Sequence, residues 1–284
     1  MDCRNIAQEV YDLARSDDPL ATVVREALEV IDCGLDTHGQ ESVSISFNGG
    51  KDCTVLLHLY AGALARRLAR GHTMKPIPAI YIPVPSPFPS LEKFIEETVK
   101  NYNLDLFRCS SHPEQAENMV TTSTFTDSLY TKQPKPNASK PKGPDGMRRA
   151  LEAYKRRFPH ITAILIGTRR SDPHGAKLSH RNMTDEGWPQ FERINPIINW
   201  SYSQVWTFLR QLKVPYCCLY DEGYTSLGST FNTFPNPALL IESTVTKNEI
   251  LSPEPRYRPA YELQDGNLER SGRGLAMSSI HMKT

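Results

Sequence analysis

The 284-residue sequence predicts an α/β fold in which a twisted parallel sheet has helices on both faces. Short apolar runs of strand length alternate along the chain with longer amphipathic runs of helical period. Such alternation is typical of parallel sheets, because parallel neighbours are joined by crossover helices. The chain is also long enough to bury a large core without disulfides. We expect residues 1–220 to form this domain. Residues 221–284, which are dense in Pro and Gly, should lie over the sheet as an irregular segment.

A helical lead-in is predicted over residues 1–40. Apolar side chains recur at helical spacing in residues 4–15 and 19–33. Pro19 suits the first turn of the second helix, because an amide hydrogen is not needed there. Gly34 is expected to end that helix. We therefore predict two helices before the first strand.

The first two strands are predicted at residues 43–47 and 79–83. The first alternates apolar and small polar side chains, and the second is a short apolar run. Each strand is followed by a change to helical period, over residues 54–70 and 90–101. Ser90 is the predicted N-cap of the second of these helices, because its hydroxyl can accept a hydrogen bond from a first-turn amide.

The alternation continues to the end of the domain. Further strands are predicted at residues 104–108, 163–167 and 192–197, and further helices at 145–158 and 201–212. The last helix opens with Ser-x-x-Gln, which is a capping box. Residues 121–144 interrupt the pattern and are rich in Thr, Ser, Pro and Lys, which predicts a flexible surface loop. In such sheets ligands bind beyond the carboxyl ends of the strands.

The charge balance and the cysteines exclude several classes of protein. Lys and Arg number 33 and Asp and Glu 32, so the net charge is +1 and nucleic-acid binding is not expected. None of the six cysteines forms a Cys-x-x-Cys pair, which disfavours a zinc ribbon or a redox centre. The first residues resemble no signal peptide, and the longest aliphatic runs are of strand length. We expect a cytoplasmic monomer that neither enters a membrane nor binds nucleic acid.

The strongest local signal lies between a predicted strand and a predicted helix. It is the run Ser46-Phe47-Asn48-Gly49-Gly50-Lys51-Asp52-Cys53. Two glycines permit a tight turn and let backbone N–H groups approach an anion closely. The helix N-terminus and Lys51 add positive charge. This predicts a pyrophosphate cradle, with an ordinary glycine turn as the alternative. A Walker A loop is excluded, because that needs Gly-x-x-x-x-Gly-Lys-Ser/Thr.

Two further runs contain charged residues of the kind found in ligand sites. The first, after another predicted strand, is Gly167-Thr168-Arg169-Arg170-Ser171-Asp172-Pro173. Guanidinium groups bind phosphate oxygens bidentately, so its two arginines are candidate anion ligands. Asp172 is either a structural ion-pair partner or a functional carboxylate. The second run, Glu269-Arg270-Ser271-Gly272-Arg273-Gly274, is a solvated tail by composition. Trp188 either packs in the core or stacks on a planar ring.

Taken together, these runs resemble the PP-loop ATP-pyrophosphatase superfamily. Within it they resemble the eukaryotic FAD synthetases (FMN adenylyltransferases), the branch similar to PAPS reductases. SFNGGKDCTVLLHL and AILIGTRRSDP carry the resemblance, and GWPQFERINPIINW, VPYCCLYDEGYTSLGS and PAYELQDGNLERSGR continue it in order. It covers residues 43–274 apart from the 121–144 loop.

The resemblance implies a nucleotidyltransferase that transfers AMP from Mg-ATP to the phosphate of FMN, giving FAD and pyrophosphate. The implied ATP site consists of Ser46, Phe47, Asn48, Gly49, Gly50, Lys51, Ile82 and Gly167. The implied flavin site consists of Arg169, Arg170, Asp172, Trp188, Arg270 and Arg273, so residues 221–284 become a flavin-binding segment. The expected catalytic residues are Asn48, Asp52 and Asp172. Asp52 and Asp172 would hold Mg²⁺ directly or through water.

A PAPS reductase is the alternative enzyme. Its chemistry requires a nucleophilic cysteine in a C-terminal Glu-Cys-Gly-like motif, and no cysteine follows Cys218. A tRNA-thiolating enzyme of the superfamily would need paired cysteines and a basic surface. A non-catalytic flavin- or nucleotide-binding protein is the alternative of a different class. Lys51, Asp52 and Asp172 argue against it, and an assay for turnover separates the two.

Overall fold

A six-stranded sheet forms the centre of the computed structural model, which describes residues 2–69, 71–109, 144–173, 175–241 and 255–274. The strand order is β3-β2-β1-β4-β6-β5. The strands are β1 (Val43–Ser46), β2 (Ile77–Tyr81), β3 (Leu104–Arg108), β4 (Ala163–Leu165), β5 (Arg181–Met183) and β6 (Glu192–Ile194). All pairs are parallel except β5 with β6. The predicted α/β fold with a mainly parallel sheet is confirmed, and the antiparallel edge strand β5 is an addition to it.

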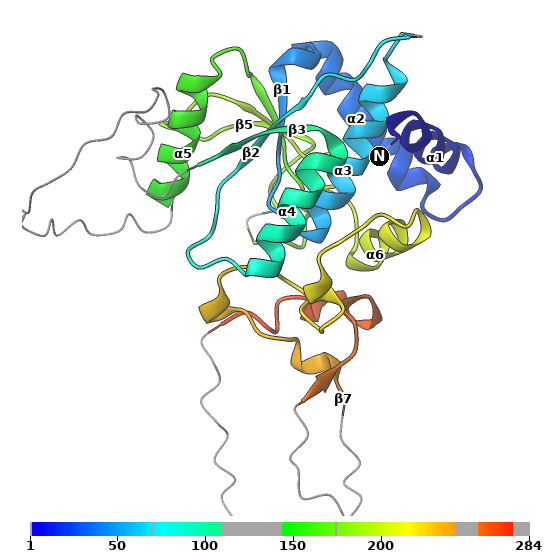
Figure 1. Cartoon of the computed structure of the whole chain (residues 1–284), viewed down its shortest axis with the longest axis vertical. Coiled ribbons are helices and arrows are strands. Elements are labelled where there is room, and N and C mark those ends of the chain that lie inside the picture. The colour runs from blue at the N-terminus through cyan, green and yellow to red at the C-terminus, as the bar shows by residue number, and fades with distance from the viewer. Residues whose placement is uncertain (1, 70, 110–143, 174, 242–254, 275–284) are drawn as a thin grey trace, which may run out of the picture.

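Helices cover both faces of the sheet (Figure 1). They are α1 (Cys3–Arg15), α2 (Ala21–His38), α3 (Lys51–Arg66), α4 (Pro89–Tyr102), α5 (Pro144–Arg157) and α6 (Tyr202–Gln211). Ile45 and Ala79 belong to the larger core cluster, to which every helix except α5 contributes. Ile80 and Ile164 point the other way and pack with Tyr154 of α5. Successive strand residues face opposite sides, so one short apolar strand serves both cores.

Two predictions about helix ends are wrong. Gly34 does not end the second helix, which runs on to His38. A β-carbon at Gly34 would lie 2.6 Å from the Cδ1 atom of Ile194, so this glycine allows α2 to approach β6 closely. Ser90 is not an N-cap, because α4 begins at Pro89 and has no side-chain cap. The predicted capping box before α6 is confirmed at Ser201.

The C-terminal segment has little regular structure. Its described residues, 221–241 and 255–274, contain four short 3₁₀ turns, Thr230–Asn232, Pro237–Leu239, Ala260–Glu262 and Gly266–Leu268. It also contains the antiparallel pair β7 (Leu240–Ile241) and β8 (Arg256–Tyr257). Figure 1 shows it beyond the ends of α4 and α6, below the sheet. The predicted 121–144 loop lies outside the described residues except for Pro144, which begins α5.

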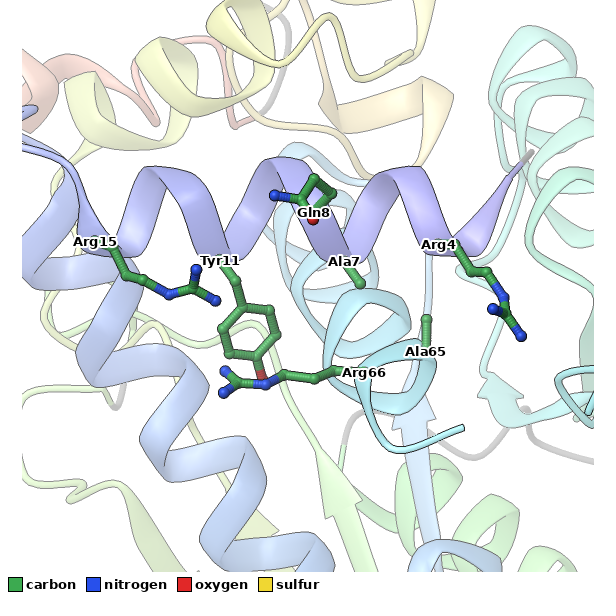
Figure 2. Close-up of a pocket in the computed structure, with 7 residues that line it drawn as sticks. All are labelled: Arg4, Ala7, Gln8, Tyr11, Arg15, Ala65 and Arg66. Carbon is green, nitrogen blue, oxygen red and sulfur yellow. The ribbon is translucent and has the colours of Figure 1, made fainter. Parts of the chain in front are cut away.

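A hollow of about 220 Å³ lies between α1 and the end of α3 (Figure 2). The guanidinium of Arg66 lies 4.0 Å from the centre of the Tyr11 ring, which is a cation–π contact. The hydroxyl of Tyr11 donates a hydrogen bond of 3.1 Å to Asp32 of α2. These contacts join α1 to α3 and to α2. None of the residues predicted to form a site lines the hollow. Among the described residues, no helix combines the length and the hydropathy needed to cross a bilayer.

One buried histidine should make folding sensitive to acid. His58 of α3 is 2% exposed, and its Nδ1 atom lies 2.8 Å from the hydroxyl of Tyr102. Burial lowers the pKa of His58 to about 4. The unfolded chain therefore takes up this proton near pH 6.5 and the folded chain only near pH 4, so stability falls as the pH falls through that window. We expect His58 to contribute about 3 kcal/mol of this loss, at about 1.4 kcal/mol per pKa unit.

Denaturant unfolding of the native chain and of His58→Asn at several pH values between 4 and 8 measures this effect. The variant should lose less of its free energy of unfolding than the native chain does below pH 6.5. Parallel curves for the two proteins would show that His58 is protonated equally in both states.

Candidate active site

The loop between β1 and α3 is held in shape by its own residues. Gly49 has φ +73°, and a β-carbon there would lie 2.7 Å from Leu91 and 2.8 Å from Ile95 of α4. A glycine is therefore required both by the backbone conformation and by the close packing of the loop against α4. The amide of Gly50 donates a hydrogen bond of 2.9 Å to Oδ1 of Asn48, which stabilises the turn.

Cys53 orients the side chain of Asn48 from the first turn of α3. Its thiol donates to Oδ1 of Asn48 at 2.9 Å, and the amide of Asn48 donates to its sulfur at 3.5 Å. Burial raises the pKa of Cys53 to about 12, so the thiol stays protonated. With its oxygen held twice, Asn48 presents its NH₂ group at the exposed tip of the loop. Sequence reasoning assigned no role to this cysteine.

The first amide of α3 has a partner that lies 169 positions later in the chain. The amide of Lys51 donates a hydrogen bond of 2.9 Å to the hydroxyl of Tyr220, which is 1% exposed. Burial raises the pKa of Tyr220 well above its usual range, so the hydroxyl is neutral and keeps its own proton. No periodicity or spacing in the sequence indicates that Tyr220 lies at this helix N-terminus.

A buried charge cluster lies beside the loop. We use this name for Lys51, Asp52, Arg169, Asp172 and Glu269, which are linked by five ion pairs. The ammonium of Lys51 contacts Asp52 at 3.0 Å and also contacts Glu269. The guanidinium of Arg169 lies 2.8 Å from Asp52, 3.3 Å from Asp172 and 2.5 Å from Glu269. Two predicted motifs and the C-terminal segment therefore meet here.

The charges in this cluster act on one another strongly because they are shielded from water. Burial alone would lower the pKa of the Arg169 guanidinium, but the carboxylates of Asp52 and Glu269 outweigh burial and raise it. Burial also raises the pKa of Asp172, although the amide and the guanidinium of Arg169 oppose this effect. The amide of Arg169 donates to Asp172 at 2.8 Å. Asp172 thus fixes both the backbone and the side chain of Arg169.

The cluster has the composition of a site that accepts a further cation. It holds three carboxylates against two cationic side chains, which leaves one excess negative charge. The Oδ1 atom of Asp52 is buried and has the Nε atom of Arg169, at 2.8 Å, as its ion-pair partner. No group of three His, Cys, Asp or Glu side chains with metal-binding geometry occurs among the described residues. Carboxylate oxygens suit Mg²⁺, which binds few protein ligands and keeps several waters.

The two adjacent arginines have different environments. Arg169 is 0% exposed and all its ion pairs are inside the cluster. Arg170 is exposed, and it donates to Asn199 at 2.8 Å and to the carbonyl of Leu178 at 3.0 Å. Only Arg170 is therefore open to solvent, although the sequence makes the pair look equivalent.

The remaining predicted residues lie at strand ends or in turns. Phe47 is buried, and its amide donates to the carbonyl of Ile80 at 2.9 Å, so both its side chain and its N–H are already engaged within the fold. Ser46 and Ile82 are partly buried at the ends of β1 and β2. Gly167 follows β4, and a β-carbon there would lie 2.9 Å from the Cys53 amide of α3.

Two further arginines lie close together in the C-terminal segment. Arg273 is partly buried and donates to the carbonyl of Leu227 at 2.6 Å, whereas Arg270 is exposed. Burial lowers the pKa of Arg273, and the positive charge of Arg270 lowers it further. In the part of the chain that the structure describes, neither guanidinium is ion-paired with a carboxylate. Two neighbouring unpaired cations favour an anionic ligand.

Trp188 lies in the turn between β5 and β6 and is partly buried. Its amide donates to the carbonyl of Asp185 at 3.1 Å. Its ring stacks on no other aromatic ring of the described chain. The geometry is compatible with either interpretation of this residue.

Residues 42–235 match the model of the phosphoadenosine phosphosulfate reductase domain. The chain is 35% identical over 249 residues to a probable FAD synthase of Schizosaccharomyces pombe, covering 87% of this chain and 77% of that protein. It is 34% identical to a probable FAD synthase of Caenorhabditis elegans over 88% of this chain, but it spans only 40% of the length of that relative.

A solved structure is similar over almost the whole chain. It is the FMN adenylyltransferase of Candida glabrata in complex with FAD and inorganic pyrophosphate. The TM-score is 0.72 at 28% identity, and the match covers 95% of this chain and 99% of that one. The structural similarity therefore extends beyond residue 235, where the domain match ends, into the segment that carries Arg270 and Arg273.

Proposed function

Because the chain belongs to the FAD synthase family and carries the phosphoadenosine phosphosulfate reductase domain, we infer that it is an FMN adenylyltransferase. It transfers the AMP unit of ATP to the phosphate of FMN and releases pyrophosphate. One observation supports this activity over the reductase alternative. The similarity to FMN adenylyltransferase covers 95% of the chain and so includes the C-terminal segment, whereas the reductase domain match stops at residue 235.

The reaction requires positioning more than covalent help from the protein. A phosphate oxygen of FMN forms a bond to the α-phosphorus of ATP, and the bond from that phosphorus to the pyrophosphate oxygen breaks. The phosphate of FMN is already ionised at neutral pH, so the protein need not supply a nucleophile or remove a proton. In-line transfer of this kind depends on holding the reactants and neutralising charge.

We assign the phosphates of ATP to the loop before α3. The NH₂ group of Asn48 and the amide of Gly49 would donate to phosphate oxygens, with the N-terminus of α3 behind them. Gly50, whose amide already donates to Asn48, would shape the loop around the phosphates. Lys51 has its ammonium between two carboxylates, so we assign it a supporting charge behind the loop. Adenine would lie against the backbone near Ser46, Phe47, Ile82 and Gly167.

We assign Mg²⁺ to Asp52 and Asp172, held mainly through water because both carboxylates already pair with cations. When bound together with ATP, this ion would offset the negative charge of the phosphates and of the cluster. Asp172 keeps its proposed catalytic role through this ion and through Arg169, whose guanidinium and amide it fixes.

We assign the flavin nucleotide to Arg170, Arg270, Arg273 and Trp188. Arg169, a predicted flavin ligand, is buried and acts in this proposal from behind the site. A monomeric state, a cytoplasmic location and the lack of a nucleic-acid partner stay predictions of the sequence. So does the division of the chain at residue 220.

The inferred reaction is tested by incubating the protein with Mg-ATP and FMN. We expect FAD and pyrophosphate to appear in equal amounts. Chromatography measures the FAD, and a coupled phosphate assay measures the pyrophosphate. The control replaces FMN with riboflavin, which lacks the attacking phosphate and should give neither product. Binding of FMN without product would favour the non-catalytic alternative instead.

The loop assignment predicts separate effects at its two glycines. A β-carbon at Gly50 would lie 3.0 Å from Oδ1 of Asn48, so Gly50→Val should displace that side chain. Losing one charged hydrogen bond costs about 1.5–3 kcal/mol, so the affinity for an ATP analogue should fall roughly ten- to a hundredfold. Gly49→Ala is the comparison variant, because its β-carbon meets α4, so it should lower stability, whereas Gly50→Val should leave stability nearly unchanged. Titration and thermal unfolding of both variants measure the two effects, and wild-type affinity in Gly50→Val would refute the assignment.

A further inference from the structure

Glu269 is the residue through which the C-terminal segment enters the charge cluster. Its side chain lies 218 positions from Lys51 and 100 positions from Arg169, yet it contacts both. One carboxylate oxygen accepts from the ammonium of Lys51, and the other accepts from Arg169 at 2.5 Å. Lys51 begins α3 and Arg169 follows β4. A single carboxylate therefore ties three separate parts of the chain together.

The backbone at Glu269 is held as firmly as its side chain. Its carbonyl accepts a hydrogen bond of 2.6 Å from the hydroxyl of Thr225. The carbonyl of Leu268 accepts one of 2.8 Å from the side-chain amide of Asn236. Thr225 and Asn236 are 1% and 0% exposed and are hydrogen-bonded to each other. The peptide groups before and after Glu269 are thus each held by a hydrogen bond from a buried side chain.

The stretch after Glu269 carries the two arginines assigned to the flavin. The carbonyl of Gly272 accepts from the amide of Phe234 at 2.9 Å, and Arg273 forms a bridge with Thr233. Arg270 comes directly after Glu269, and its side chain is exposed. Of the contacts that hold this stretch, those of the Glu269 carboxylate are the ones that reach the first residue of α3 and the residue after β4.

We propose that Glu269 is a positioning residue, whose carboxylate sets the place of Arg270 and Arg273 relative to the ATP loop. Lys51 and Arg169 are its anchors. The proposal rests on the proposed function, because it concerns the affinity for FMN. It assigns Glu269 no contact with either substrate, so its whole effect on FMN passes through the two arginines.

The charge count allows a variant that still folds. Glu269→Gln leaves Lys51 and Arg169 paired with Asp52 and Asp172, so two cations face two carboxylates. No buried charge is left without a partner, which is the situation that most destabilises a buried network. Glu269→Asp is the second variant. It keeps the charge, but it is one methylene shorter and cannot reach both anchors.

The test is an FMN titration of the full chain followed by flavin fluorescence. We expect Glu269→Gln to raise the Kd for FMN about tenfold, and Glu269→Asp to raise it less. Glu222→Gln is the matched control, because Glu222 is an exposed acid of the same segment. The key comparison uses Arg270→Ala/Arg273→Ala as the background. There, adding Glu269→Gln should change the Kd less than about twofold, because coupled residues are not additive.

Three outcomes would overturn the proposal. One is a wild-type Kd in Glu269→Gln. Another is an equal fold-loss in the native and the double-arginine backgrounds, which would indicate direct contact with FMN or a general structural role. The third is equal hydrogen exchange of residues 266–274 in Glu269→Gln and Glu222→Gln without ligand. The proposal expects faster exchange in Glu269→Gln, because the anchoring contacts are weakened there. This readout involves no flavin, and the turnover assay on the native chain tests the proposed function separately.

Discussion

Arg169→Met should lower the free energy of unfolding by about 3–5 kcal/mol, the usual effect of breaking a buried ion network from one side. The Arg169 guanidinium is paired with Asp52, Asp172 and Glu269, and its side chain is 1% exposed. Without it, three carboxylates would face only the ammonium of Lys51. Methionine fills a similar volume, so the loss reflects charge rather than a cavity.

Denaturant unfolding of Arg169→Met and of Arg170→Met measures this effect. Arg170 has the same side chain one position later, but it is exposed and makes only hydrogen bonds to the loop surface. Its replacement should change stability by no more than about 1 kcal/mol. FAD formation should be abolished in Arg169→Met. Similar losses of stability in the two variants would show that the buried network does not hold the site together.

Arg270→Ala/Arg273→Ala should remove most of the affinity for FMN. Each arginine can make a charged hydrogen bond worth about 1.5–3 kcal/mol, so together they account for about 3–6 kcal/mol, roughly a hundred- to ten-thousandfold in Kd. Neither guanidinium is needed to neutralise a carboxylate of the described chain, so the fold should survive. The affinity for an ATP analogue should stay near its native value, since the loop before α3 is unchanged.

Titrations with FMN and with the analogue test this prediction. The control is Arg256→Ala/Arg258→Ala, which removes two exposed arginines from the same segment and changes the net charge equally. An equal loss of FMN affinity in the control would indicate a general electrostatic effect. Native FMN affinity in Arg270→Ala/Arg273→Ala would remove both residues from the flavin site.

The local parts of the fold could be predicted because they depend on neighbours in the sequence. Alternation at period two and recurrence at helical spacing place β1, β3, α5 and α6 nearly at their observed bounds. The helix predicted over residues 54–70 is placed too late, because α3 begins at Lys51 in the loop itself and ends at Arg66. The capping box at Ser201 is likewise an interaction within four residues. The glycine-rich turn between a strand and a helix marks the candidate site for the same reason. Its shape is set by Asn48, Gly49 and Gly50 themselves.

Other features depend on contacts that no local pattern contains. Gly34 looks like a helix terminator, but it lies inside α2, where the absence of a β-carbon leaves room for Ile194 of β6. Arg169 and Arg170 are adjacent and chemically identical, but tertiary packing buries the first and leaves the second in solvent.

Sequence alone determined the α/β class, the glycine-rich loop of the candidate site and the charged residues available to it. Only the tertiary structure decided which of those charges face one another. Glu269 lies in a run that composition describes as a solvated tail, yet it is buried against Lys51 and Arg169. The physical reason is that local patterns depend on contacts within a few residues, whereas the burial of a charge depends on partners from distant segments. An isolated charge is costly to bury, so Glu269 enters the interior only where the fold supplies both cations.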